Sequence, residues 1–257
     1  MRMTAVLIVC AISFGMGQRA EAQNSAPSPI LVELFTSEGC SSCPPADARL
    51  QQMDAAQFLG DAQLIVLSEH VDYWNQDGWK DPYSAPLFTE RQGDYVRALG
   101  LATPYTPQFI VDGISELRTD DTQKMNQVFA KAGAAAKIPV SIGSLSVDGS
   151  APAKLRGRVE IDGSSEKHNA SVYLAVALNH AESQVLHGEN GGRHLNHVAV
   201  VQQLVKIGKL EKGRKFSQDF EANLKPGTDP GNVRVIVFVQ ESGPGRVVGA
   251  ALQRTIN

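Results

Sequence analysis

Apolar and polar positions follow two different patterns along the chain, and the change between them comes near residue 138. In the first part, short apolar runs alternate with longer segments in which apolar residues recur at helical spacing. The runs at 30–36, 64–68 and 108–111 are typical of buried strands. An Asp112-Gly113 turn signal then leads into a further strand at 114–117.

Amphipathic helices are predicted between and after these strands. The third of them follows a capping segment, Thr119-Asp120-Asp121. The residues expected to share one face of each helix are Ala46, Leu50, Met53 and Gln57/Phe58; Leu87, Arg91, Tyr95 and Leu99; and Met125, Val128, Phe129 and Ala132. The first part therefore reads β-α-β-α-β-β-α over residues 30–133.

Strand-like patterns dominate beyond the Ala/Gly-rich stretch that ends near Pro139. Apolar residues alternate with charged ones over 155–162, and further strand-like runs occupy 172–178 and 233–240. Gly, Ser, Asn and Pro clusters separate these runs, which favours an antiparallel β sandwich of about 115 residues. The run at 198–207 fits either a strand or a helix.

The first 22 residues have the order of a secretory signal peptide. Arg2 precedes an apolar run over residues 4–14, and small and polar residues follow up to Ala22, where cleavage is expected. The run is shorter than the roughly 20 apolar residues that span a bilayer. We therefore expect a periplasmic or secreted protein without a stable membrane anchor.

The cysteines say more than the net charge about which classes of function are possible. The 257 residues carry a net charge of −3, which favours no nucleic-acid partner. Of three cysteines, one lies in the signal segment, so the mature chain keeps Cys40 and Cys43. Two cysteines do not make a disulfide-dense scaffold, and in an exported protein they are expected in an oxidising compartment.

Cys40-Ser41-Ser42-Cys43 lies where a predicted strand ends and a helix begins. Backbone N–H groups and the helix dipole favour a thiolate on the first cysteine, so Cys40 is the predicted attacking thiol. Cys43, inside the first turn, is the predicted resolving thiol. The alternative is a static, structural disulfide.

At this motif the chain resembles the thioredoxin superfamily. Thr106-Pro107 before the strand at 108–111 is similar to that superfamily's Thr-Pro step, which implies that Pro107 is cis and lies beside the cysteines. The resemblance also implies that Thr106 and Pro107 present backbone to a bound substrate. Gly39 departs from the pattern, since thioredoxins have Trp before the first cysteine. Their buried acid aligns with Leu34, which leaves Glu33 out of phase on the strand.

A narrower resemblance covers nearly all of the mature chain. The segments VELFTSEGCSSCPPAD, SEHVDYWNQDGWKDP, YTPQFIVDG and GENGGRHLNHVAVV are similar to domain-of-unknown-function family 1223, an uncharacterised family of exported bacterial proteins. This resemblance implies a thioredoxin-like fold and brings no established reaction.

The stretch between Cys43 and Pro107 contains an insert at about 69–86 that departs from thioredoxin spacing. It follows the carboxyl end of a strand, where open α/β sheets place ligands. Its aromatic residues are either a substrate platform or a lid that packs on its own domain. The residues concerned are Tyr73, Trp74 and Trp79, with His70 and Asp72 as a candidate proton shuttle.

Four histidines, His180, His187, His194 and His197, fall close together in the second part. With Glu182 or Glu189 they suggest a metal site, but loop histidines without fixed ligand spacing are usually surface residues, and we predict no metal. The glycine-rich segment 188–193 is predicted to be a turn because it does not have phosphate-loop spacing.

Taken together, these observations predict an α/β thioredoxin-like N-terminal domain at 23–137, followed by an all-β sandwich-like domain at 138–257. The predicted function is an exported thiol–disulfide oxidoreductase-like protein that needs no cofactor and acts on a protein or small-molecule thiol or disulfide. Its predicted site comprises Cys40, Cys43 and Pro107, with Thr106, Tyr73, Trp74 and His70 in contact with substrate. The alternatives are a non-catalytic binding module with a structural disulfide, and a metal-binding protein. The direction of exchange and the oligomeric state stay open.

Overall fold

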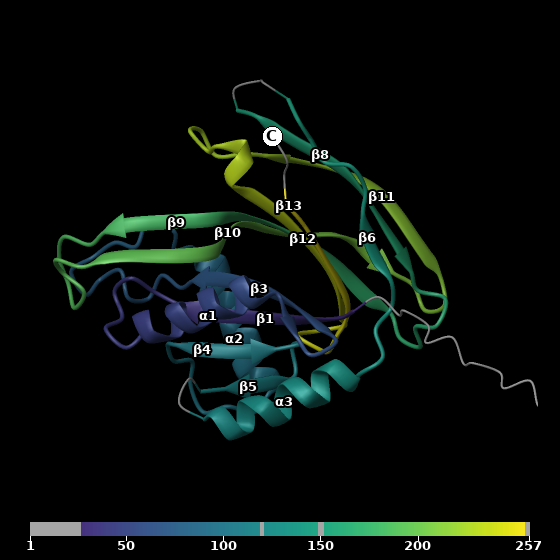
Figure 1. The fold of residues 1–257 in the computed structure, drawn as a ribbon, viewed down its shortest axis with the longest axis horizontal. Coiled ribbons are helices and arrows are strands. Elements are labelled where there is room, and N and C mark those ends of the chain that lie inside the picture. The colour runs from purple at the N-terminus through teal and green to yellow at the C-terminus, as the bar shows by residue number, and fades with distance from the viewer. Residues whose placement is uncertain (1–26, 119–120, 149–151, 255–257) are drawn as a thin grey trace, which may run out of the picture.

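A nine-stranded mixed sheet runs through both parts of the chain in the computed structural model, which describes residues 27–118, 121–148 and 152–254 (Figure 1). The strands follow the spatial order β13-β12-β9-β10-β3-β1-β4-β5, with β2 paired to β3. Their bounds are β1 (Ser28–Thr36), β2 (Phe58–Leu59), β3 (Ala62–His70), β4 (Gln108–Val111), β5 (Ser115–Leu117), β9 (Ala170–Gln184), β10 (His194–Leu210), β12 (Val233–Glu241) and β13 (Val247–Arg254).

A smaller, four-stranded sheet packs over the C-terminal part of the large one. Its order is β11-β8-β6, with β7 paired to β8. Its strands are β6 (Val140–Ile142), β7 (Ser146–Val147), β8 (Lys154–Asp162) and β11 (Lys215–Asn223). Alternate residues of β8 and β12, such as Val159 and Val235, bury their side chains in the apolar layer between the two sheets.

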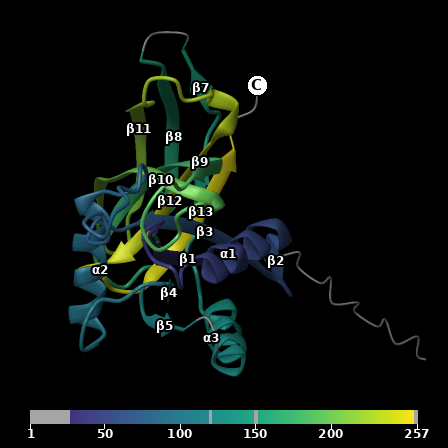
Figure 2. The same cartoon turned by 90° about the vertical axis from the view of Figure 1, so that its left-hand side faces the viewer.

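Helices cover both faces of the N-terminal part of the large sheet (Figure 2). Leu50 of α1 (Pro44–Ala56) and Phe129 of α3 (Thr122–Ala134) share one apolar cluster with Val32 of β1. Phe88 and Tyr95 of α2 (Pro86–Ala98) pack on the opposite face. A short 3-10 helix, η1 (Pro230–Asn232), precedes β12. In the described part of the chain no helix has the length and apolarity that crossing a membrane requires.

The predicted architecture of a thioredoxin-like α/β domain followed by a separate sandwich is wrong. The fold is mostly β. The C-terminal strands β10, β9, β12 and β13 do not form a separate domain sheet but extend the sheet that β1, β3 and β4 begin. The junction is the parallel pair β3–β10, where Ser68 lies opposite Val200. Local patterns cannot reveal such a junction, because each strand's pattern reports only that it is buried, not which strand lies beside it. The proposed division of the chain near residue 138 stays a prediction.

Several local predictions are confirmed. Helices and strands form where periodicity places them, and Asp112 and Gly113 adopt the left-handed conformation of the expected hairpin turn. The run at 198–207 is a strand, part of β10. The predicted face of α2 is only partly correct. Leu87, which was expected on that face, is exposed, whereas Arg91 is buried as expected, although within a polar cluster. The predicted signal peptide and the capping residues Thr119 and Asp120 lie outside the described residues.

Candidate functional site

The two cysteines form a disulfide between the end of β1 and the start of α1. The Cα atoms of Cys40 and Cys43 are 5.4 Å apart, and the Cys43 amide donates to the Cys40 carbonyl at 3.2 Å. Cys43 is the residue before the first turn of α1, so the motif lies at the positive end of that helix. Both cysteines are buried, whereas Ser41 and Ser42 are exposed. The predicted strand–helix position of the motif is therefore confirmed.

The loop before β4 lies against the disulfide. The Thr106–Pro107 peptide bond is cis, which confirms that expectation. The Cys40 sulfur is 3.9 Å from the Thr106 carbonyl oxygen and 3.3 Å from the Ser42 hydroxyl. Sheet topology explains the meeting, because β4 is the antiparallel neighbour of β1, with Gln108 opposite Phe35.

The aromatic insert packs on this loop, with its side chains half-buried. The Trp74 indole N–H donates to the Thr106 hydroxyl at 2.8 Å, and the Tyr73 hydroxyl donates to Gln92 at 3.2 Å. A Cβ on Gly39 would come within 3.0 Å of the Trp74 Cβ, so the close approach of Trp74 explains the glycine before the first cysteine. Trp74 thus contacts Thr106 directly, while Tyr73 contacts Gln92, whose amide donates to the Tyr105 carbonyl at 2.8 Å.

His70 is fully buried behind the motif rather than exposed to a substrate. Its Nδ1 is 2.7 Å from an Asp81 carboxylate oxygen, which also accepts from the Glu38 amide at 2.9 Å. Asp72, its predicted partner in proton transfer, instead accepts from the Thr89 hydroxyl at 2.6 Å. The structure therefore does not bring the His70–Asp72 pair together.

Three buried ionisable residues lie next to the motif: Glu38, Asp47 and His197. The sequence pointed to His197 only as a possible metal ligand, and Glu38 and Asp47 were not singled out. The His197 Nε2 is 3.3 Å from a Glu38 oxygen, and its Nδ1 is 3.9 Å from an Asp47 oxygen. Burial alone would lower the pKa of His197, but Asp47 and Glu38 outweigh it and raise the pKa to about 9. His197 is therefore a buried imidazolium between two carboxylates, and its ring meets that of His70 with centroids 4.8 Å apart.

The turn between β9 and β10 also reaches the motif. Glu189 accepts a hydrogen bond from the Ser41 amide at 3.0 Å, and Asn190 donates to the carbonyls of Glu38 and Cys40 at 2.8 and 2.9 Å. The predicted turn at 188–193 is confirmed, with left-handed Gly188 and Gly192. Its position over the cysteines is a tertiary feature that the turn signal does not contain.

Glu33 lies on the α2 face of the sheet, whereas α1, which starts at the motif, packs on the opposite face. Its carboxylate accepts from the Arg91 guanidinium and the Tyr95 hydroxyl, each at 2.6 Å. Glu69 lies beside this group, 3.7 Å from Arg91. Because side chains alternate across a strand, the one-residue offset from Leu34 removes Glu33 from the α1 side.

The histidines that lie close together in the sequence do not form one cluster in the structure. His194 pairs with Glu182 at 3.4 Å on the surface, while His197 is buried with Glu38. Across the described ranges, no three His, Cys, Asp or Glu side chains are arranged to hold a metal ion.

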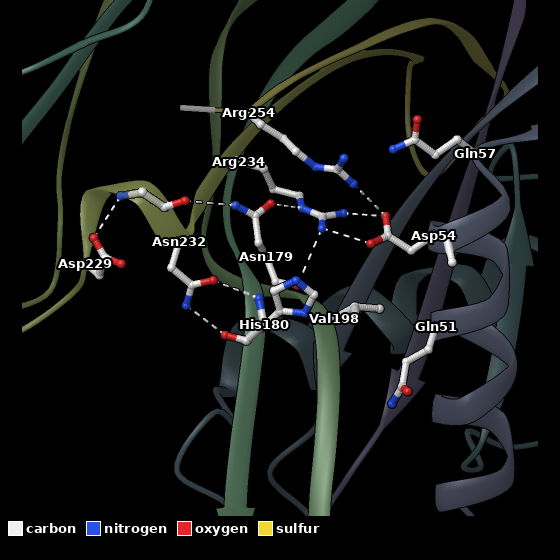
Figure 3. Close-up of a pocket in the computed structure, with 12 residues that line it drawn as sticks. Gln51, Asp54, Gln57, Asn179, His180, Val198, Asp229, Asn232, Arg234 and Arg254 are labelled. Carbon is white, nitrogen blue, oxygen red and sulfur yellow. Dashed lines mark hydrogen bonds and ion pairs between the residues drawn. The ribbon is translucent and has the colours of Figure 1, made fainter. Parts of the chain in front are cut away.

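A polar cavity of about 870 Å³ lies between α1, β9, η1 and the ends of β12 and β13 that carry Arg234 and Arg254 (Figure 3). Figure 3 shows Asp54 of α1 facing Arg234 and Arg254. Arg234 is 1% exposed and forms two hydrogen bonds with Asp54, at 2.6 and 2.9 Å. Smaller hollows of about 580 and 190 Å³ share Gln51 with this cavity and extend along the hairpin to His197.

The chain is similar to two solved protein structures over most of its length. A crystal structure of a protein from Agrobacterium tumefaciens is 27% identical, with a TM-score of 0.67, and the match covers 89% of this chain and 96% of that one. HBP35 of Porphyromonas gingivalis shares the fold at 16% identity, with a TM-score of 0.64 over 90% of this chain and 76% of that one. No curated protein matches. The family described as proteins of unknown function, DUF1223, matches residues 31–240, and the chain therefore belongs to that family.

Proposed function

We propose that the protein is an exported thiol–disulfide oxidoreductase-like protein whose Cys40–Cys43 pair exchanges with the thiols or disulfide of a partner. The observation that carries this proposal is the position of the disulfide at the β1–α1 junction with the Thr106 carbonyl 3.9 Å from the Cys40 sulfur. The local resemblance to the thioredoxin superfamily, at the cysteine motif and the Thr-Pro step, supports it.

The helix start and the exposed serines suit Cys40 to the role of the exchanging sulfur. The amide end of α1 favours negative charge on a nearby sulfur, and the Ser42 hydroxyl, 3.3 Å from the Cys40 sulfur, is placed to donate to a thiolate. Ser41 and Ser42 are the exposed members of the motif, so a partner approaches across them. Because Cys40 is 1% exposed, the side chains above it must move aside for a thiol to reach it.

The exchange starts from the disulfide in the structure. A partner thiolate attacks the Cys40 sulfur, so that a mixed disulfide forms while the Cys40–Cys43 bond breaks and Cys43 leaves as a thiolate that takes up a proton. A second partner thiol loses its proton and attacks the partner sulfur of the mixed disulfide, which releases Cys40 as a thiolate. The partner dithiol is thereby oxidised and the protein reduced by two electrons. In the reverse direction Cys40 attacks and Cys43 resolves.

Trapping of the mixed disulfide tests the proposal. Cys43→Ser removes the resolving thiol, so a partner should stay bound to Cys40 in a complex that a reductant releases. The matched control is Cys40→Ser, which keeps only the predicted resolving thiol, Cys43, and should trap far less. Equal trapping by both single variants, or none by Cys43→Ser, would contradict the proposal.

A second candidate is a non-catalytic binding module in which the disulfide is structural. The observation that favours it is the polar cavity of about 870 Å³, which lies at the other end of α1 from the cysteines. The reduction potential separates the two candidates. A potential below about −300 mV would mark the disulfide as structural, whereas a higher value would support exchange.

A further inference from the structure

The turn between β9 and β10 is built to hold one position over the cysteine motif. Hydrogen bonds inside it join Gly191 to Gly188 at 3.0 Å and Gly192 to Val185 at 2.8 Å. A Cβ on Gly188 would lie 3.1 Å from the Asp77 carbonyl and 3.2 Å from the Trp79 Cβ, so the turn also lies tightly against the aromatic insert. The turn is therefore fixed both by its own bonds and by its neighbours.

Asn190 anchors this turn to the motif. Its side chain is fully buried, and its amide nitrogen uses both hydrogens, on the carbonyls of Glu38 and Cys40. Its amide oxygen accepts from Arg193 at 2.9 Å. A buried amide with every group satisfied holds its neighbours in place. The residue before it, Glu189, is thereby held beside Ser41.

Glu189 places a carboxylate on the backbone of the motif itself. One of its oxygens accepts from the Ser41 amide at 3.0 Å, and Ser41 is the residue that follows Cys40. That hydrogen bond lowers the pKa of Glu189, so the carboxylate is charged at neutral pH. Glu38, Asp47 and His197 belong to the buried set behind the motif, and Arg193, in the same turn as Glu189, contacts the Asn190 amide oxygen.

We propose that Glu189 is a positioning residue that restrains the reactivity of Cys40 by holding a negative charge at the Ser41 amide. The inference rests on the proposed thiol–disulfide exchange and assigns a regulating residue to the same site. In the reduced protein, Cys40 ionises by releasing one proton to leave a thiolate. A neighbouring carboxylate repels that thiolate and occupies an N–H group at the same turn, so the thiol form is favoured.

The test separates charge from hydrogen bonding. Glu189→Gln keeps an oxygen that accepts from Ser41 but removes the charge, whereas Glu189→Ala removes both. Glu182→Gln is the matched control, because Glu182 belongs to the same hairpin and its carboxylate faces His194 instead. All are made in the Cys43→Ser background, so that only Cys40 titrates, and the thiolate is followed by its ultraviolet absorbance against pH.

Glu189→Gln should raise the acid dissociation constant of the Cys40 thiol about threefold, the size expected for an exposed charge. Alkylation by iodoacetamide below the thiol pKa should quicken by a similar factor. The difference should shrink at high salt, because exposed charges are screened, and Glu182→Gln should behave like the parent.

An unchanged dissociation constant in Glu189→Gln would overturn the inference, as would an equal shift in Glu182→Gln or a shift confined to Glu189→Ala. The failure of this inference can be told apart from the failure of the proposed function. If Cys43→Ser traps no partner while Glu189→Gln still shifts the Cys40 titration, the exchange function fails and the electrostatic role of Glu189 stands. If Cys43→Ser traps a partner but Glu189→Gln does not shift the titration, the exchange function stands and the role of Glu189 fails.

Discussion

Glu33 and Glu69 lie on the same face of neighbouring parallel strands, yet their carboxylates have different partners. Glu33 accepts from Arg91 and Tyr95, whereas neither oxygen of Glu69 has a hydrogen bond. Burial, and then the charge of Glu33, raise the pKa of Glu69 well above 4.5 although Arg91 lowers it. The surroundings of Glu69 therefore favour its neutral, protonated form.

The two glutamates should respond differently to neutralisation. Glu33→Gln leaves the buried Arg91 without its main counter-ion and should lower the free energy of unfolding by about 3 kcal/mol. Glu69→Gln resembles the protonated side chain and should change it by less than about 1 kcal/mol. Urea denaturation at neutral pH measures both values. Equal losses would contradict the preference of Glu69 for its neutral form.

Glu69 should also give the protein a pH dependence. Because its pKa is raised in the folded state, the folded protein binds a proton that the unfolded chain releases above about pH 4.5. Stability therefore falls as the pH rises from that value towards the folded pKa. Denaturation midpoints between pH 5 and 7 should decline in the parent and decline less in Glu69→Gln.

His197 should also contribute stability that declines with rising pH, over a higher pH range than that of Glu69. Its pKa of about 9 exceeds the ordinary 6.5, so its stabilising charge is fully present below about pH 6.5 and is lost as the pH rises towards 9. The loss should be at most about 3 kcal/mol. Thermal melts from pH 6 to 9 should show a decline in the parent that His197→Gln removes, and an equal decline in that variant would exclude His197 as its source.

At the scale of elements, Arg234 joins strand β12 to helix α1. Asp54 accepts two of its hydrogen bonds, at 2.6 and 2.9 Å, and Asn179 of β9 accepts a third at 2.8 Å. The pair is buried and connects residues 180 positions apart in the chain. It therefore ties the C-terminal strands to the helix that carries the cysteines.

Removing the Arg234–Asp54 ion pair should strongly destabilise the protein, because Arg234 is 1% exposed. Asp54→Ala should lower the free energy of unfolding by about 3–5 kcal/mol, since it leaves a buried charge unpaired. Arg158 and Asp219 provide the control: they make two bonds of similar length, 2.6 and 2.9 Å, but both are exposed. Asp219→Ala should change the stability far less, because water solvates both partners of this exposed pair. Chemical denaturation compares the variants, and similar losses would contradict the role given to burial.

At the scale of the whole molecule, the sheet makes the two parts of the chain depend on each other. Strand β3 has β1 on one side and β10 on the other. The apolar layer on the α2 face combines Leu31 and Ile65 with Ile236 and Phe238 from the C-terminal part. Either part alone would expose a sheet edge and an apolar surface.

We therefore expect that neither 23–137 nor 138–257 folds when expressed alone, and that the full chain unfolds in one transition. Calorimetry of the full chain and of both fragments measures this. A fragment that unfolds cooperatively by itself would instead support two independent domains with a boundary near residue 138.

Local features were predicted well because neighbouring residues set them. The periodicity of Ala46, Leu50 and Met53 predicts the buried face of α1, and all three are buried. Asp47 and Asp54 share that burial without any apolar signal, because their partners, His197 and Arg234, come from distant strands. Sequence spacing alone does not identify such pairs.

Periodicity, turn chemistry and chain neighbours were enough to predict the elements, the Asp112-Gly113 turn, and the position of the cysteine pair at a strand–helix junction. The tertiary structure selects which strands pair, and it places the C-terminal strands in the first sheet. It also decided that Glu189 and Asn190 reach the cysteines and that His197 lies buried between Glu38 and Asp47. These contacts join residues about 150 positions apart, and such contacts are selected by the packing of whole strands, which no local pattern contains.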